Sequence, residues 1–145
     1  MYAVVGMGTG LGPIAARYIT GDRLGALRWS IALGYGFAVI GLLLVATLVS
    51  FEGVLLGIFI RSFGSGIIWV FSTQILLQIV LPEVRGRIFS TEIAFSMLMS
   101  AVGASIGGYY LEWFGIAGAV RTTALLTLLP CALWVGWLVF NRSAD

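Results

Sequence analysis

Residues 81–87, Leu81-Pro82-Glu83-Val84-Arg85-Gly86-Arg87, decide how the rest of the chain is interpreted. The segment holds three charged side chains, a Pro and a Gly, and a long apolar run lies on each side of it. Residues 64–81 contain no charged side chain, and residues 88–110 contain only Glu92. A short charged segment between two such runs is typical of a loop at which a chain leaves a bilayer and re-enters it.

The composition of the whole chain also indicates a membrane protein. Of its 145 residues, 60% are hydrophobic and 10% are charged. Soluble domains carry about 25% charged residues and about 45–50% apolar ones. A water-soluble fold of this length could not bury so much apolar surface, so we expect the lipid bilayer to be its surroundings. The net charge of +2 is too small to favour a nucleic-acid partner.

The residue types that carry most metal and proton-transfer chemistry are scarce. The chain has no His, its basic residues are all Arg, and Cys131 is its one Cys. The Gly-rich residues 4–12 do not meet the dinucleotide-binding pattern, because Leu11 or Pro13 stands where the third Gly is required. We therefore expect no metal, no cofactor and no enzymatic activity.

Five apolar segments have the composition of membrane helices, and a spanning helix needs about 20 mostly apolar residues. The expected helices cover residues 2–19, 29–50, 54–81, 88–111 and 117–140. The first is short of apolar residues and rich in Gly. We expect an all-α, polytopic membrane helix bundle that forms one domain over residues 1–145, with four complete transmembrane helices and one truncated helix.

The Arg residues are unevenly divided between the two sides of such a bundle. If the segments cross the membrane in succession, one side receives Arg17, Asp22, Arg23, Arg28, Glu83, Arg85, Arg87 and Arg142. The other side receives Glu52 and Glu112, with Arg121 nearby. Because cytoplasmic loops carry the excess of basic residues, we expect the Arg-rich loops and the C-terminus to be cytoplasmic, in a plasma or inner membrane.

Several helices carry pairs of Gly four residues apart, which allow helices to approach closely in lipid. The pairs are Gly6 and Gly10, Gly8 and Gly12, Gly53 and Gly57, and Gly103 and Gly107. They favour either ordinary helix packing or an interface that moves.

Two loops resemble motifs of the major facilitator superfamily. A D-R-x-G-R-R type loop of that family is matched at its centre by Asp22-Arg23-Leu24-Gly25, although Ala26-Leu27 replaces the basic pair. Pro82 and Arg85-Gly86-Arg87 resemble the loop between helices ten and eleven, as it occurs in siderophore and macrolide exporters. The whole chain resembles the carboxy-terminal half of such a transporter, helices eight to twelve.

The resemblance implies secondary active efflux of a small molecule by alternating access, driven by a proton gradient, with an amino-terminal half as partner. It also implies a cytoplasmic gate, in which acidic residues of one loop pair with Arg of another. The gate residues would be Asp22, Arg23, Glu83, Arg85 and Arg87. The alternative is a non-transporting remnant or a small membrane assembly subunit.

Four polar side chains within the apolar segments are candidates for the substrate cavity or for coupling. They are Arg61, Gln74, Gln78 and Glu92. Charges within a bilayer are costly and usually face a partner or an aqueous cavity. Arg61 either extends to the interface or contacts an anionic group, and Glu92 either pairs with a nearby Arg or takes part in proton coupling. Gln74 and Gln78 share a helix face, one turn apart.

Overall fold

The computed structural model describes residues 1–21, 23–47 and 50–141, and all secondary structure in this part of the chain is helical. The elements are α1 (Tyr2–Thr20), α2 (Leu24–Thr47), α3 (Phe51–Ile79), the short 3-10 helix η1 (Pro82–Val84) and α4 (Arg85–Phe140). Three stretches, Leu24–Thr47, Phe51–Ile79 and Pro82–Phe140, are long and apolar enough to cross a membrane. The predicted all-α class is confirmed, and the helices have the length and composition of a multi-pass membrane protein.

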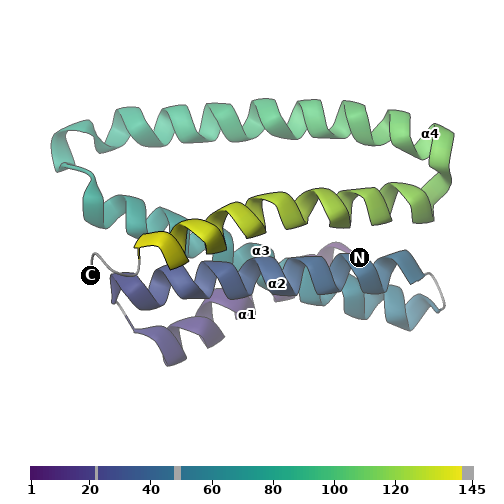
Figure 1. The fold of residues 1–145 in the computed structure, drawn as a ribbon, viewed down its shortest axis with the longest axis horizontal. Helices are drawn as coiled ribbons and strands as arrows, with labels where there is room; N and C mark the ends of the chain where they lie inside the picture. The colour runs from purple at the N-terminus through teal and green to yellow at the C-terminus, as the bar shows by residue number, and fades with distance from the viewer. Residues whose placement is uncertain (22, 48–49, 142–145) are drawn as a thin grey trace.

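The longest element, α4, is a helical hairpin rather than one rod. Gly115 has φ 65° and ψ −179°, which are not helical values. It divides α4 into a first arm, residues 85–114, and a second arm, residues 116–140. Gly adopts a positive φ more easily than other residues, so Gly115 determines where the chain reverses. Figure 1 shows the first arm running the length of the molecule and the second arm returning beside α2.

The connections between helices alternate between two ends of the molecule (Figure 1). One end holds the α1–α2 connection, the α3–α4 connection and the end of α4, whereas the other holds the α2–α3 connection and the reversal at Gly115. The first end therefore carries Arg23, Arg85 and Arg87, and the second carries Glu52. The uneven division of Arg expected from the sequence is thus a feature of the fold.

The helix α3 packs against both α1 and α2, which barely touch each other. Leu27 and Ile31 of α2 and Ile67 and Phe71 of α3 form the buried apolar cluster between those two helices. Phe71 and Leu27 are completely inaccessible. At its start, α3 is capped by Ser50, whose Oγ accepts a hydrogen bond of 3.1 Å from the backbone N–H of Gly53.

Glycines set the spacing between α3 and α1. A Cβ added to Gly8 would lie 2.7 Å from the carbonyl oxygen of Phe59, and one added to Gly12 would overlap the backbone of Phe63. A Cβ added to Gly6 or Gly10 would meet nothing within 4 Å. Of the two registers that the α1 sequence offers, only Gly8 and Gly12 form the helix contact.

The spacing between α3 and α2 is set in the same way, by glycines on both helices. A Cβ added to Gly57 would lie 2.8 Å from the carbonyl oxygen of Gly41, and one added to Gly34 would lie 2.9 Å from that of Gly64. Close backbone approach of this kind is a main source of helix association in lipid. Apolar side chains gain little free energy there by exchanging contact with lipid for contact with another helix.

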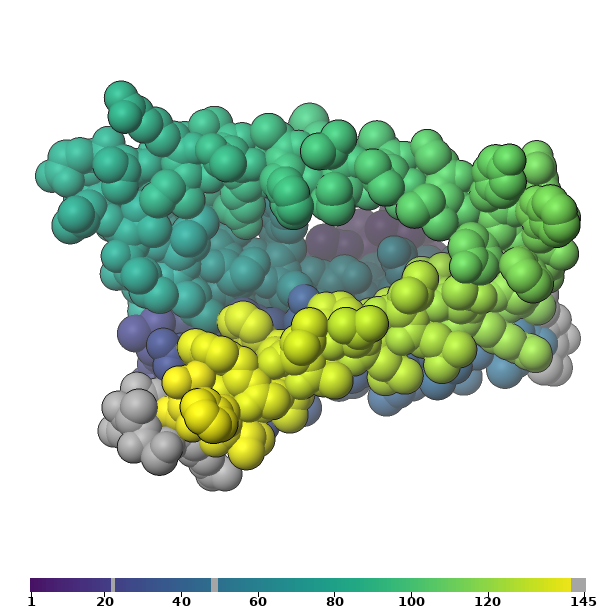
Figure 2. All heavy atoms as spheres, turned by 45° about the horizontal axis from the view of Figure 1, so that its top comes forward, coloured from purple at the N-terminus to yellow at the C-terminus, as the bar shows by residue number. Residues whose placement is uncertain are grey.

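The two arms of α4 are packed very differently. The second arm lies on α2, where the Trp134 Nε1–H donates a hydrogen bond of 3.0 Å to the backbone carbonyl of Arg28. The guanidinium of Arg28 also lies 5.3 Å from the ring centroid of Trp137. In contrast, every residue from 97 to 116 is exposed. Figure 2 shows a hollow between the arms, with atoms of α1 visible deep inside it.

We predict that Gly57→Leu lowers the free energy of unfolding by about 1–3 kcal/mol, because the larger side chain would force α2 and α3 apart. Gly107→Leu is the matched control, since a Cβ at Gly107 meets nothing within 4 Å. Its expected effect on the isolated chain is within about 0.5 kcal/mol. Denaturation in detergent micelles, followed by circular dichroism, measures both values. Equal losses in the two variants would contradict the proposed role of the glycine contacts.

Candidate functional site

A groove of about 630 Å³ lies between the end of α3 and the start of α4. Its lining residues are Ser72, Leu76, Arg87, Ile88, Thr91, Glu92 and Phe95. The volume falls in the range of about 300–1,000 Å³ that is usual for small-molecule sites. The groove brings together Arg87, predicted as a gate residue, and Glu92, predicted as a cavity or coupling residue.

The first turns of α4 place the charged side chains on this groove because residues four apart share a helix face. Arg87 and Thr91 form one such pair, and Ile88 and Glu92 form the next. The Thr91 hydroxyl donates a hydrogen bond of 2.9 Å to the backbone carbonyl of Arg87, which holds it against the helix. Glu92 is half-buried, whereas Arg87 is exposed.

The two charges do not neutralise each other. Among the described residues, no nitrogen of Arg85 or Arg87 lies within 4.0 Å of a carboxylate oxygen of Glu83 or Glu92. The groove therefore offers a cation and an anion separately, beside an apolar wall of Leu76, Ile88 and Phe95. Such a site can bind a molecule that has an apolar body and a polar or charged group.

Arg85 has a structural role that the sequence analysis did not predict. Its Nε donates a hydrogen bond of 3.1 Å to the carbonyl of Val80, and its Nη2 donates one of 3.0 Å to the carbonyl of Leu77. Carbonyls in the last turn of a helix lack helical donors, and a cation there also interacts favourably with the helix dipole. Arg85 thus fixes the connection from α3 to α4. The sequence signal is an Arg shortly after the end of a helix.

The remaining gate residues are separate in the structure. Asp22 lies outside the described residues. Arg23 is exposed immediately before α2, where its backbone carbonyl accepts a hydrogen bond of 2.9 Å from Leu27. Glu83 is exposed in η1. The pairing of acidic and basic residues between these loops stays a prediction.

The other three cavity candidates do not join the groove. Gln74 and Gln78 share a face of α3 by their spacing, but successive residues turn by about 100°, so this face points away from Ser72 and Leu76. Gln74 is half-buried and Gln78 is exposed. Arg61 is exposed on α3, toward the other end of that helix.

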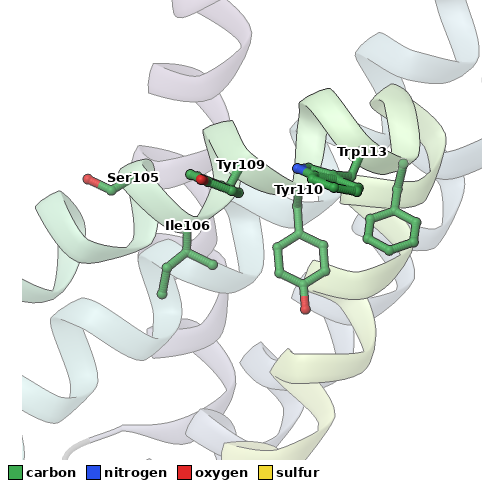
Figure 3. Close-up of a pocket in the computed structure, with 6 residues that line it drawn as sticks. Ser105, Ile106, Tyr109, Tyr110 and Trp113 are labelled. Atoms are coloured by element: carbon green, nitrogen blue, oxygen red, sulfur yellow. The ribbon is translucent and has the colours of Figure 1, made fainter.

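A second surface, made mostly of aromatic side chains, lies beside the reversal at Gly115 (Figure 3). A pocket of about 400 Å³ is lined by Ser105, Ile106, Tyr109, Tyr110, Trp113 and Phe114. The rings of Tyr110 and Phe114 stack with centroids 5.5 Å apart. The pocket has no charged lining residue and belongs to one helix arm. Aromatic side chains with polar tips at a helix end are typical of the membrane interface, so we assign this surface to lipid contact.

Tyr109 and Tyr110 of this surface were not predicted from the sequence. Ser72, Thr91 and Phe95 of the groove were not predicted either. For Thr91 the sequence did contain a signal, because Thr91 follows Arg87 by four residues and so lies on the same helix face. For Ser72 and Phe95 there was none, because both are ordinary residues of apolar helices.

Comparison of the chain with protein-family models, with curated proteins and with solved structures found no match. The candidate site therefore stands on its own geometry.

We predict that Arg85→Ala lowers the free energy of unfolding by about 1–2 kcal/mol, because two carbonyls at the end of α3 would lose their charged donor. Arg87→Ala is the matched control, since it removes the same type of side chain from the same turn of α4 and is expected to cost about 0.5 kcal/mol or less. Chemical denaturation in detergent checks both. An Arg87→Ala variant that is the less stable of the two would refute the capping role.

Proposed function

We propose that the chain is part of a secondary active transporter that exports a small molecule by alternating access, with the helix arrangement of the carboxy-terminal half of a major facilitator superfamily exporter. In this arrangement the elements correspond to one truncated helix, α1, and four complete spans, with the two arms of α4 as separate helices. The observation that carries the proposal is the groove with Arg87 and Glu92, located at the Arg-bearing end of the helices.

The unpacked first arm of α4 supports the proposal that another half of the transporter is present. The face is apolar as well as exposed: Phe95 is 62% accessible and Met97 is 69% accessible. In the proposed transporter, the part of this arm that holds Phe95 and Met97, with the adjacent groove, contacts an amino-terminal half, which completes the substrate cavity. That half is either another chain or another part of a longer polypeptide.

The groove accounts for the chemistry that an exporter needs at its inner opening. A substrate with an apolar body would contact Leu76, Ile88 and Phe95, and its polar group would interact with Arg87 or Glu92. Glu92 is the proposed proton carrier, because it is a half-buried carboxylate on the cavity wall. If the same cavity released the substrate and took up a proton, export of the substrate would be coupled to entry of the proton.

The second candidate function is that of a non-transporting membrane subunit or remnant. It is favoured by the same exposed first arm, because residues 97–116 offer an apolar face that another subunit could cover. Transport measurements on the protein in its native membrane distinguish the two functions, since a subunit or remnant moves no substrate when the groove residues are intact.

We predict that Asp22→Asn and Arg87→Ala each slow export and shift the transporter toward its inward-facing state. A charge network at such an interface biases a conformational equilibrium by about 1 kcal/mol, which corresponds to about fivefold. Efflux of a fluorescent amphiphile from cells expressing the complete transporter measures the rate. Arg121→Ala, at the opposite end of the helices, is the control and should transport normally. Normal rates in both gate variants would eliminate the gate.

We predict that Glu92→Gln abolishes the dependence of transport on the proton gradient, because the amide cannot carry a proton. Transport rates at several external pH values, in proteoliposomes containing the complete transporter, test this. Glu112→Gln, near the reversal of α4, serves as the control and should keep the wild-type pH profile. An unchanged profile in Glu92→Gln removes this residue from proton coupling.

A further inference from the structure

A smaller cavity, separate from the groove, lies between α1 and α2 with α3 as its floor. Its volume is about 190 Å³. The lining residues are Ala15, Ala16, Ile19, Thr20, Ser30, Leu33, Phe37, Phe63 and Ile67. It exists because α1 and α2 each pack on α3 and barely touch each other.

The polar feature of this cavity is a pair of hydroxyl groups. The Thr20 Oγ1 and the Ser30 Oγ are 2.9 Å apart, one from the end of α1 and the other from the second turn of α2. Ser30 is only 7% accessible. A buried polar side chain at a helix junction is costly unless it is hydrogen-bonded, so the pair is a specific feature of the site.

Counting hydrogens shows what the pair still offers. A Thr hydroxyl has one hydrogen, and Thr20 donates it to the carbonyl of Ala16 at 2.7 Å. Ser30 must therefore be the donor to Thr20. The Ser30 Oγ is left with both lone pairs free, because no described residue donates to it. The pair thus presents hydrogen-bond acceptors to the cavity and can accept from a donor there.

The rest of the lining restricts the ligand further. Apart from the hydroxyl pair, the lining side chains are apolar, and no described residue that lines the cavity is charged. A volume of 190 Å³ is smaller than the about 300 Å³ at the lower end of drug-sized sites. Ile19 and Leu33 at its rim are 89% and 63% accessible, so the cavity can be entered from the lipid phase.

We propose that this cavity binds a small, neutral, mostly apolar molecule that carries one hydroxyl donor, such as an alcohol or a phenol, and that the ligand enters from the lipid phase. The hydroxyl of the ligand donates to the Ser30 Oγ, and its hydrocarbon part contacts Leu33, Phe37 and Phe63. The inference is independent of the transport function, since the cavity shares no residue with the groove.

The test uses 4-fluorophenol, which has a hydroxyl donor, and 4-fluoroanisole, in which a methyl group replaces the hydrogen of that hydroxyl. Binding of each to the purified full chain in nanodiscs is measured by fluorine NMR. The Ala15→Leu variant, whose larger side chain fills the cavity, defines the signal that is specific to it. We expect 4-fluorophenol to bind about fivefold more tightly than 4-fluoroanisole, the ratio for one net hydrogen bond.

Ser30→Ala should remove this preference and leave the binding of 4-fluoroanisole unchanged, whereas Thr127→Val, on the second arm of α4, should preserve it. Ser30→Cys, whose sulfur is only a weak acceptor, is a second variant in case Ser30→Ala does not fold, and it should weaken the preference as well. Equal affinities for the two probes, or binding of 4-fluorophenol that persists in Ala15→Leu, would overturn the proposal.

Discussion

The close approach of α3 to α1 and α2 is the constraint on which the rest of the structure depends. A bilayer provides no hydrophobic force between helices, so their association relies on contact between backbones and small side chains. Gly8 and Gly12 allow this contact with α1, and Gly41 and Gly57 allow it with α2. The three helices then form the platform on which the second arm of α4 lies, and they leave the cavity between α1 and α2.

The first arm of α4 is positioned by its two ends rather than by packing along its length. At one end, Arg85 donates to the last carbonyls of α3, and at the other, Gly115 turns the chain back toward α2. The groove with Arg87 and Glu92 lies at the first of these ends. A site held in this way is open on the side where its first arm lacks a neighbour, which agrees with a function that needs a second set of helices.

The sequence predicted some of these features and not others for identifiable reasons. The charged loop around Arg85 and Arg87 was apparent because charges interrupt apolar runs. The presence of Arg87 and Glu92 on one groove was not, because it depends on where the helix begins after the loop and on how it lies against α3. Gln74 and Gln78 looked equivalent to Glu92 as polar residues in a helix, yet the direction of their face depends on how α3 is rotated against its neighbours.

The sequence by itself determined the helical class, the apolar segments and the excess of Arg at one end, because these follow from composition and from the length of apolar runs. Only the tertiary structure decided which Gly residues of α1 contact α3. Gly6 and Gly10 have the same four-residue spacing as Gly8 and Gly12, and the two pairs differ only in the face of the helix on which they lie. The tertiary structure also decided that Arg85 caps a helix and that Thr20 meets Ser30. The contact of Thr20 with Ser30 joins separate helices, and no local pattern specifies it. For Arg85, the sequence offered an Arg shortly after a helix but not the carbonyls that it would reach.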